Sequence, residues 1–138
     1  MRIGVLTGGG DCPGLNAVIR SVVRTATTHY DSQVVGFRDG WRGLLEDRTT
    51  PLDIAAVDGL LTRGGTTLGS ARVAPERLNA GIAEMKGVLA RHGIDVLIPQ
   101  VAPRVAQPTV LAVPSAHTTS PARPGRVASQ RAASAPRA

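Results

Sequence analysis

Two glycine-rich segments contain the residue types and spacings that suit phosphate chemistry. The first glycine loop, residues 8–16, reads GGGDCPGLN, and the second glycine loop, residues 63–72, reads RGGTTLGSAR. Glycine lets a backbone approach a phosphate closely, and free N–H groups at a helix start attract an anion. Hydroxyl groups and arginine guanidinium groups add further donors to phosphoryl oxygens. From the residues alone, the first loop could instead be an ordinary tight strand-to-helix turn, and the second a solvent-exposed turn.

Other chemistry in the first glycine loop has less support. The loop matches neither the dinucleotide G-x-G-x-x-G pattern nor a Walker A loop, because no Gly-Lys-Ser/Thr follows. A helix N-terminus could activate the thiol of Cys12, but no histidine lies nearby in the sequence to act as a base. A small residue in a tight loop is the favoured interpretation of Cys12. As the single cysteine, it also excludes a disulfide within the chain.

The elements that position the first glycine loop are a strand and a helix. Residues 2–7 form a short apolar run that is typical of a buried strand. A helix is expected from near Pro13 or Gly14 to about His29, because its apolar residues recur at helical spacing. Residues 33–38 then resemble a second strand.

Two more helices and another strand are predicted downstream. A short helix is expected after Asp53, which is a suitable N-cap. A longer helix is expected to begin at Pro75 and to stop at Gly93. Residues 94–98 then form a further apolar run. This alternation predicts an α/β fold with a Rossmann-like parallel sheet and right-handed crossovers.

The charge and composition of the chain change near residue 99. Residues 1–99 contain all 10 acidic and 11 of the 16 basic residues, so they carry only +1 of the formal +6. Residues 100–138 contain five arginines, no acidic residue, no aromatic residue and six of the ten prolines. We therefore expect a folded part over residues 1–99 and a disordered Arg/Pro/Ala-rich tail over residues 100–138.

The composition also bears on partners and location. Arginines in the tail could give salt-dependent affinity for nucleic acid, but without aromatic residues they offer no stacking platform, which disfavours that function. The N-terminus lacks a signal-peptide core, and no apolar stretch reaches the roughly 20 residues of a membrane span. The sequence therefore predicts a soluble cytoplasmic protein.

Three motifs together resemble the phosphofructokinase family. That family carries GGDxPGxN after its first strand, DGxxGL after its second and RGGTxLGSAR later. Here these motifs appear as GGDCPGLN at residues 9–16, DGWRGL at residues 39–44 and RGGTTLGSAR at residues 63–72. The resemblance extends over residues 1 to about 98. It implies part of the N-terminal, donor-binding domain of a bacterial, actinobacterial-type 6-phosphofructokinase.

The resemblance also implies an activity and roles for single residues. It implies phosphoryl transfer from ATP or pyrophosphate to fructose 6-phosphate in glycolysis, with Mg²⁺, by a homo-oligomer. Gly10 would approach the donor phosphates, Arg72 would contact them and stabilise the transferring group as a catalytic residue, and the Val73 backbone would line the donor site. Arg20 and Arg24 match a helix position that binds the allosteric nucleotide in some bacterial members. A solvated helix face is the favoured interpretation of these two.

The resemblance stops after Pro99. The family continues there into a Gly-Gly-Asp/Glu-Gly loop that binds the donor and its magnesium, whereas residues 100–104 read QVAPR. The Thr-Ile-Asp-Asn-Asp motif that supplies the family's catalytic base is also absent, and no metal ligand is predicted. We therefore expect a truncated chain that is inactive alone, with a non-catalytic phosphate-binding remnant as the alternative. Residues 100–138 resemble GC-rich coding sequence read out of frame, which predicts a frameshift near codon 99.

Overall fold

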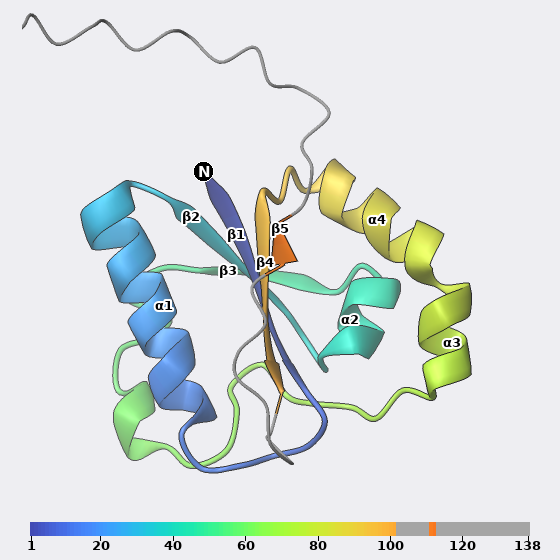
Figure 1. The fold of residues 1–138 in the computed structure, drawn as a ribbon. Helices are drawn as coiled ribbons and strands as arrows, with labels where there is room; N and C mark the ends of the chain where they lie inside the picture. The colour runs from blue at the N-terminus through green and yellow to red at the C-terminus, as the bar shows by residue number, and fades with distance from the viewer. Residues whose placement is uncertain (102–110, 113–138) are drawn as a thin grey trace, which may run out of the picture.

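The structure is a computed structural model that describes residues 1–101 and 111–112 (Figure 1). Apart from residues 100, 101, 111 and 112, the predicted disordered tail lies outside the described residues. Among the residues that the structure describes, no helix combines the length and apolar character needed to cross a bilayer.

A central parallel core confirms the predicted α/β fold. Strand β1 (Arg2–Gly8) pairs in parallel with β2 (Gln33–Phe37) on one side and with β4 (Val96–Val101) on the other. Helix α1 (Leu15–Tyr30) connects β1 to β2. The predicted strands and the first helix are therefore present, with ends shifted by a few residues.

Two edge strands that the sequence analysis did not predict run antiparallel, so the sheet is mixed rather than wholly parallel. Strand β3 (Thr49–Leu52) pairs with β2, and β5 (Leu111–Ala112) pairs with β4, which gives the order β3-β2-β1-β4-β5. Strand β3 contains Pro51, which an edge strand tolerates because one side of its backbone needs no ladder partner. Strand β5 is a short described segment within residues 100–138, where the sequence predicts disorder.

The prediction of a short helix after Asp53 is wrong. The Asp53 carboxylate does accept a hydrogen bond from the backbone N–H of Ala56, at 2.7 Å, as an N-cap would. The chain nevertheless continues as turns over residues 54–59, and Gly59 at their end adopts a left-handed conformation with φ 71°. Only a single 3₁₀ turn, η1 (Leu60–Thr62), follows.

The long helix predicted from Pro75 is two helices, α3 (Pro75–Ala80) and α4 (Ile82–Arg91), separated at Gly81. Gly81 packs against Leu45 from the short helix α2 (Trp41–Leu45), and a Cβ at Gly81 would lie 2.3 Å from Leu45 Cδ2. This contact comes from a distant part of the chain, so the helical periodicity could not predict the break.

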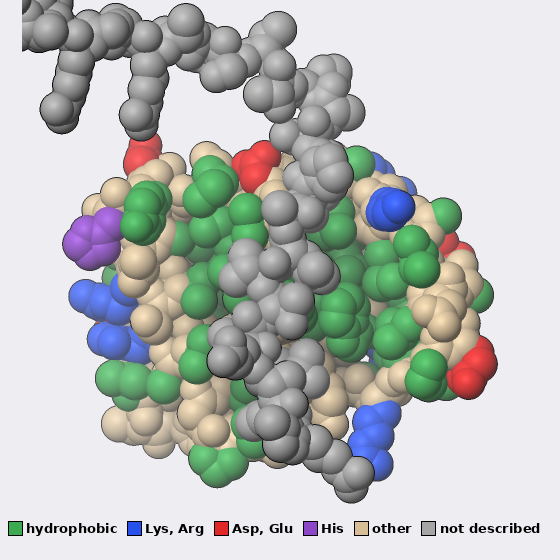
Figure 2. All heavy atoms as spheres, in the orientation of Figure 1, with side chains coloured by type: hydrophobic (Ala, Val, Ile, Leu, Met, Phe, Trp, Pro, Cys, Tyr) green, Lys and Arg blue, Asp and Glu red, His purple; other side chains and the backbone are tan. Residues whose placement is uncertain are grey.

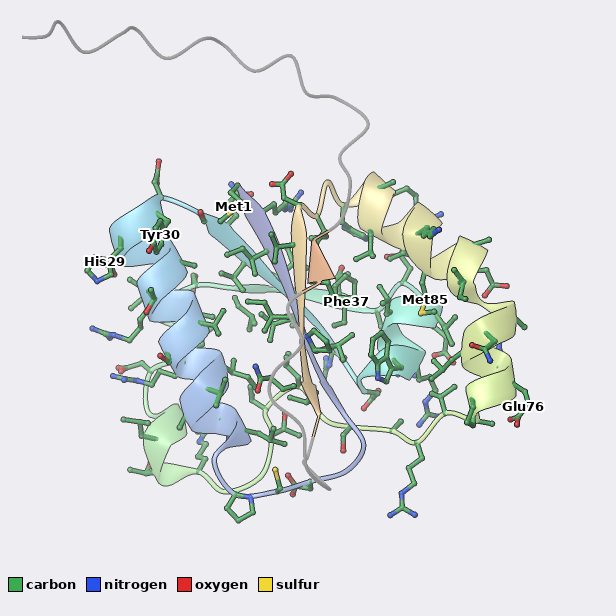
Figure 3. All side chains as sticks on the ribbon, in the orientation of Figure 1. Met1, His29, Tyr30, Phe37, Glu76 and Met85 are labelled. Atoms are coloured by element: carbon green, nitrogen blue, oxygen red, sulfur yellow. The ribbon has the colours of Figure 1, made fainter. Side chains whose placement is uncertain are left out.

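Helices cover both faces of the sheet (Figure 1). Helix α1 packs on one face, and α2 and α4 pack on the other. Each interface has its own apolar cluster, and Phe37, on the α4 side, is fully buried (Figure 3). The α1-side cluster contains Ile3, Val5, Ile19, Val23, Ala26, Val34, Leu52, Val57, Leu60 and Leu68. The α4-side cluster contains Leu6, Val35, Phe37, Leu44, Val88, Leu89, Ile94 and Leu97.

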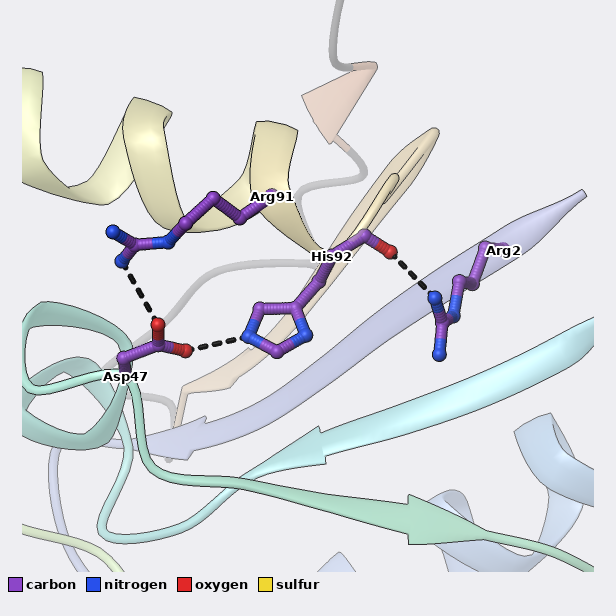
Figure 4. A network of polar contacts seen from close by, with 4 residues as sticks. All are labelled: Arg2, Asp47, Arg91 and His92. Atoms are coloured by element: carbon purple, nitrogen blue, oxygen red, sulfur yellow. Dashed lines mark hydrogen bonds and ion pairs between the residues drawn. The ribbon is translucent and has the colours of Figure 1, made fainter.

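A polar network joins the end of α4 to the loop after α2 (Figure 4). One Asp47 oxygen lies 2.5 Å from His92 Nε2, and the other accepts a hydrogen bond from Arg91 at 2.8 Å. The backbone oxygen of His92 in turn accepts a hydrogen bond from the Arg2 guanidinium at 2.9 Å. The hydrogen bond with His92, followed by the charges of His92 and Arg91, lowers the pKa of Asp47 below its ordinary value of 3.8.

This network predicts a loss of stability in acid. A carboxyl group with a lowered folded pKa stabilises the fold above its unfolded pKa, and that contribution disappears as the pH falls through the folded pKa. We expect Asp47→Asn to be less stable than the parent chain at pH 7 and to lose less further stability as the pH falls below about 4. Urea unfolding at a series of pH values measures this, with the exposed Asp58→Asn as control. Parallel pH profiles for Asp47→Asn and the parent chain would contradict it.

Candidate phosphate-binding site

The first glycine loop leaves its backbone open at the carboxyl end of β1. Gly10 has φ 143°, and no heavy atom lies within 4 Å of the position that a Cβ would occupy there. Gly14 is the N-cap residue of α1, with φ 95° and no side-chain hydrogen bond to the helix start. The loop therefore presents exposed backbone and uncapped amides, the features that suit an anion.

Asn16 ties the two glycine loops together from the first turn of α1. Its side chain is buried, with 4% of the residue exposed. Nδ2 donates to the backbone oxygen of Arg63 at 3.0 Å and approaches that of Gly64 at 3.4 Å, while Oδ1 accepts from the N–H of Thr67 at 2.7 Å. One amide side chain thus satisfies donors and acceptors of the second loop and fixes it against α1.

Further contacts fix the rest of the second loop against the sheet. The hydroxyl of Thr7, at the end of β1, donates to the backbone oxygen of Gly69 and lies 3.0 Å from the hydroxyl of Thr66. The N–H of Asp39 donates to the backbone oxygen of Leu68 at 2.8 Å. The second loop is therefore attached to the carboxyl ends of both β1 and β2, where open α/β sheets bind ligands.

The role of Asn16 leads to a stability prediction. Asn16→Ala removes the shared partner of two or three part-buried hydrogen bonds, and each such bond contributes about 0.5–1.5 kcal/mol. We expect the variant to lose roughly 2 kcal/mol of unfolding free energy, measured by urea denaturation. Asn79→Ala, at an exposed position of α3, is the matched control. Equal stability of the Asn16→Ala and Asn79→Ala variants would show that the second loop does not depend on this link.

Beyond the second loop, the chain lines a basic groove of about 410 Å³. Arg72 and Val73 lie in it, as do Arg42 from α2 and Arg77 from α3. Three guanidinium groups surround one hollow, with Glu46 as the one acidic residue of the lining. This arrangement favours a ligand that carries several negative charges.

The structure brings together some of the predicted site residues. Arg72 and Val73 line the basic groove, whereas Gly10 lies in the first loop and outside the residues that line it. Asn16 connects the first glycine loop to residues 63–67 of the second glycine loop, the segment that precedes the groove residues. Arg42 and Arg77 were missed, and no local sequence signal identifies them, because α2 and α3 reach the groove only through tertiary packing. The sequence does contain a signal for the structural role of Asn16, because a polar amide lies on the apolar face of a predicted helix.

Arg20 and Arg24 lie away from the basic groove. They line a second hollow of about 430 Å³ along α1, together with His29. Arg24 is exposed and Arg20 is half-buried. Both the solvated helix face and the nucleotide contact stay predictions.

The described residues do not fit a resident metal. Within the described part of the chain, no three His, Cys, Asp or Glu side chains lie together in a group that could hold a metal ion. Cys12 is half-buried in the first loop. The Mg²⁺ that the resemblance implies has no such group of ligands among the described residues.

The sequence model of phosphofructokinase matches residues 2–100. The chain belongs to the phosphofructokinase family. An ATP-dependent 6-phosphofructokinase from Mycobacterium leprae is 61% identical over 100 residues, which are 72% of this chain and 29% of that protein. A pyrophosphate–fructose 6-phosphate 1-phosphotransferase from Streptomyces coelicolor is 59% identical over 98 residues, which are 71% of this chain and 29% of that protein.

Solved structures of phosphofructokinases share the fold. The Saccharomyces cerevisiae phosphofructokinase structure matches with a TM-score of 0.66 and 38% identity, over 71% of this chain and 13% of the yeast chain. A Pichia pastoris phosphofructokinase structure in the T-state matches with a TM-score of 0.65 and 36% identity, over 71% of this chain and 11% of that one. The segment shared with the curated relatives is thus less than a third of their length.

Proposed function

We propose that the two glycine loops and the basic groove bind the phosphates of a phosphoryl donor in the 6-phosphofructokinase reaction. In that reaction a phosphoryl group moves from ATP or pyrophosphate to fructose 6-phosphate and gives fructose 1,6-bisphosphate. The observation that carries the proposal is the Asn16 link, which holds an open glycine backbone and an arginine-rich loop in one unit. Membership of the family supplies the reaction class.

Each part of the site has a distinct role in the proposal. The half-buried backbone at Gly10, with open space where a Cβ would lie, receives donor phosphate oxygens, because a side chain there would obstruct them. The Arg72 guanidinium contacts the transferring group and stabilises the charge that it carries in the transition state. Val73 lines the same groove beside Arg72, and in the proposal its backbone meets the donor.

The donor is ATP or pyrophosphate, since relatives of nearly equal identity are named for each. Fructose 6-phosphate as acceptor, a cytoplasmic location and a homo-oligomeric assembly belong to the same proposal, by family. The proposal does not include phosphoryl transfer by the 138-residue chain alone. The chain shares only 29% of the length of its relatives, and the family match ends at residue 100.

Calorimetric titration of the purified chain tests donor binding. We expect pyrophosphate and ATP to bind, and added salt to weaken both, because the groove owes its affinity to arginines. Arg42→Ala and Arg77→Ala should each weaken binding, whereas Arg38→Ala, an exposed arginine outside the groove, should leave it unchanged. Absence of binding for both donors would refute the proposal.

A coupled assay tests whether the 138-residue chain alone is a non-catalytic phosphate-binding remnant. We expect the chain to bind donor but to give no fructose 1,6-bisphosphate with either ATP or pyrophosphate. Turnover at about 1 per second or more, an ordinary enzymatic rate, would show that the 138 residues contain a complete active site.

A further inference from the structure

Thr7 is a buried polar residue at which three segments of the candidate site meet. It is 0% exposed and lies near the end of β1, directly before the first glycine loop. Its hydroxyl contacts Thr66 and Gly69 of the second glycine loop. A Cβ at Gly40, in the turn between β2 and α2, would lie 2.3 Å from the backbone oxygen of Thr7. Both glycine loops and this turn therefore adjoin one buried residue.

The hydrogen bonds around Thr7 have a fixed direction. The backbone oxygen of Gly69 can only accept, so the Thr7 hydroxyl donates its one proton there. The Thr66 hydroxyl lies 3.0 Å from that of Thr7 and must therefore donate to it. Thr66 in turn accepts from the N–H of Leu68, at 3.2 Å. A chain of hydrogen bonds thus runs from Leu68 through both hydroxyls to Gly69.

This chain of hydrogen bonds ends at the turn from which Arg72 extends. Residues 66–69 form the turn, in which the N–H of Gly69 donates to the backbone oxygen of Thr66 at 3.3 Å. Gly69 has φ 72°, and a Cβ there would lie 2.7 Å from a carboxylate oxygen of Asp39. Residues 70–73 follow directly and line the basic groove. The two hydroxyls therefore fix the point at which the backbone enters that groove.

Arg72 depends on this support because its side chain is exposed. Figure 2 shows Lys and Arg side chains projecting into solvent beside the start of α3, the part of the surface to which the second loop leads. The place of an exposed guanidinium is set mainly by the backbone that carries it. A shift of the turn would move Arg72 relative to the first loop, and a displacement of about 1 Å can cost about 100-fold in rate.

We propose that Thr7 and Thr66 are positioning residues for Arg72. Their hydroxyls act through the backbone of the second loop and hold it where Arg72 and Gly10 bind the same phosphoryl donor. The inference rests on the proposed function, and it gives the buried hydroxyl at the end of β1 a role that is separate from packing.

A double-mutant cycle in the 138-residue chain tests this inference, with the dissociation constant for pyrophosphate measured by calorimetric titration. Thr7→Val replaces the hydroxyl with a methyl group of similar size. We expect Thr7→Val to weaken binding about fivefold and Arg72→Ala to weaken it about tenfold or more. Because Thr7 acts through Arg72, the variant with both changes should bind within about twofold of Arg72→Ala alone.

Three further variants complete the design. Thr7→Ser keeps the hydroxyl and should restore affinity to within about twofold of the parent chain. Thr66→Val repeats the cycle at a half-buried position, and it decides the outcome if Thr7→Val does not fold. Thr50→Val is the matched control, because Thr50 is a half-buried threonine on β3, outside both loops and the groove, and it should bind like the parent. Circular dichroism melts verify that each variant is folded at the titration temperature.

The possible failures are distinguishable. Losses from Thr7→Val and Arg72→Ala that multiply in the double variant would overturn the inference alone, since Thr7 would then act independently of Arg72. Parent-like binding by folded Thr7→Val, or a loss in Thr7→Ser or Thr50→Val as large as that in Thr7→Val, would also overturn it. Failure of the parent chain to bind pyrophosphate would instead refute the proposed function, together with the inference that rests on it.

Discussion

Replacing Arg72 with alanine is expected to slow phosphoryl transfer by about 100- to 1000-fold, the usual loss when one donor to a transition-state charge is removed. The measurement uses a chimeric enzyme in which residues 1–98 of this chain replace the matching segment of the Mycobacterium leprae ATP-dependent 6-phosphofructokinase, which is 61% identical over 100 residues. Arg72 is exposed in the basic groove, so its removal should change stability little. The loss should appear mainly in kcat, because the contact strengthens as charge develops on the transferring group.

Arg38→Ala in the same chimera is the control for charge alone. Arg38 is also an exposed arginine, but it lies outside the groove, so its removal should leave kcat within a few-fold of the parent. An unchanged rate in a folded Arg72→Ala variant would show that Arg72 is an ordinary surface residue. A fall in melting temperature that accounts for the lost activity would give Arg72 a structural role instead.

The elements that the sequence predicted correctly are those with strong local patterns. The apolar runs that became β1, β2 and β4, and the helical spacing of α1, depend on side chains only a few residues apart. Their alternation was enough to predict parallel neighbours for β1. Both glycine loops also had recognisable composition, and the structure attaches them to the carboxyl ends of these strands.

The features that could not be predicted depend on contacts between distant parts of the chain. The break at Gly81 follows from packing against Leu45, which is 36 positions earlier (81 − 45). Strand β3 has only a short apolar pattern and forms because β2 offers it an edge. Arg42 and Arg77 belong to the basic groove only because α2 and α3 pack on either side of it.

Gly43→Ala is expected to be the most destabilising single methyl addition in the folded part of the chain. A Cβ at Gly43 would lie 1.6 Å from the backbone oxygen of Arg38, the closest approach among the glycines in the described residues. The clashing atom belongs to the backbone, so it cannot rotate away as a side chain would. Gly43 is also fixed in place, because its backbone oxygen accepts a hydrogen bond from the N–H of Arg48 at 2.7 Å. We expect a loss of about 3 kcal/mol, near the upper end for overpacking.

Gly87→Ala tests whether this loss comes from the contact rather than from the methyl group. Gly87 lies in α4, and no heavy atom lies within 4 Å of the position of its Cβ, so alanine should stabilise that helix by roughly 0.5–1 kcal/mol. The melting temperatures of the two variants should therefore move in opposite directions, with that of Gly43→Ala lower by on the order of 15 °C.

The effect should extend to the site, since Gly43 adjoins Arg42, which would leave the basic groove if α2 moved. Pyrophosphate binding by Gly43→Ala should then be weaker than by Gly87→Ala even at temperatures where both are folded. Equal affinity and equal melting temperatures would show that α2 moves away from Arg38 without cost, and that the groove does not depend on its position.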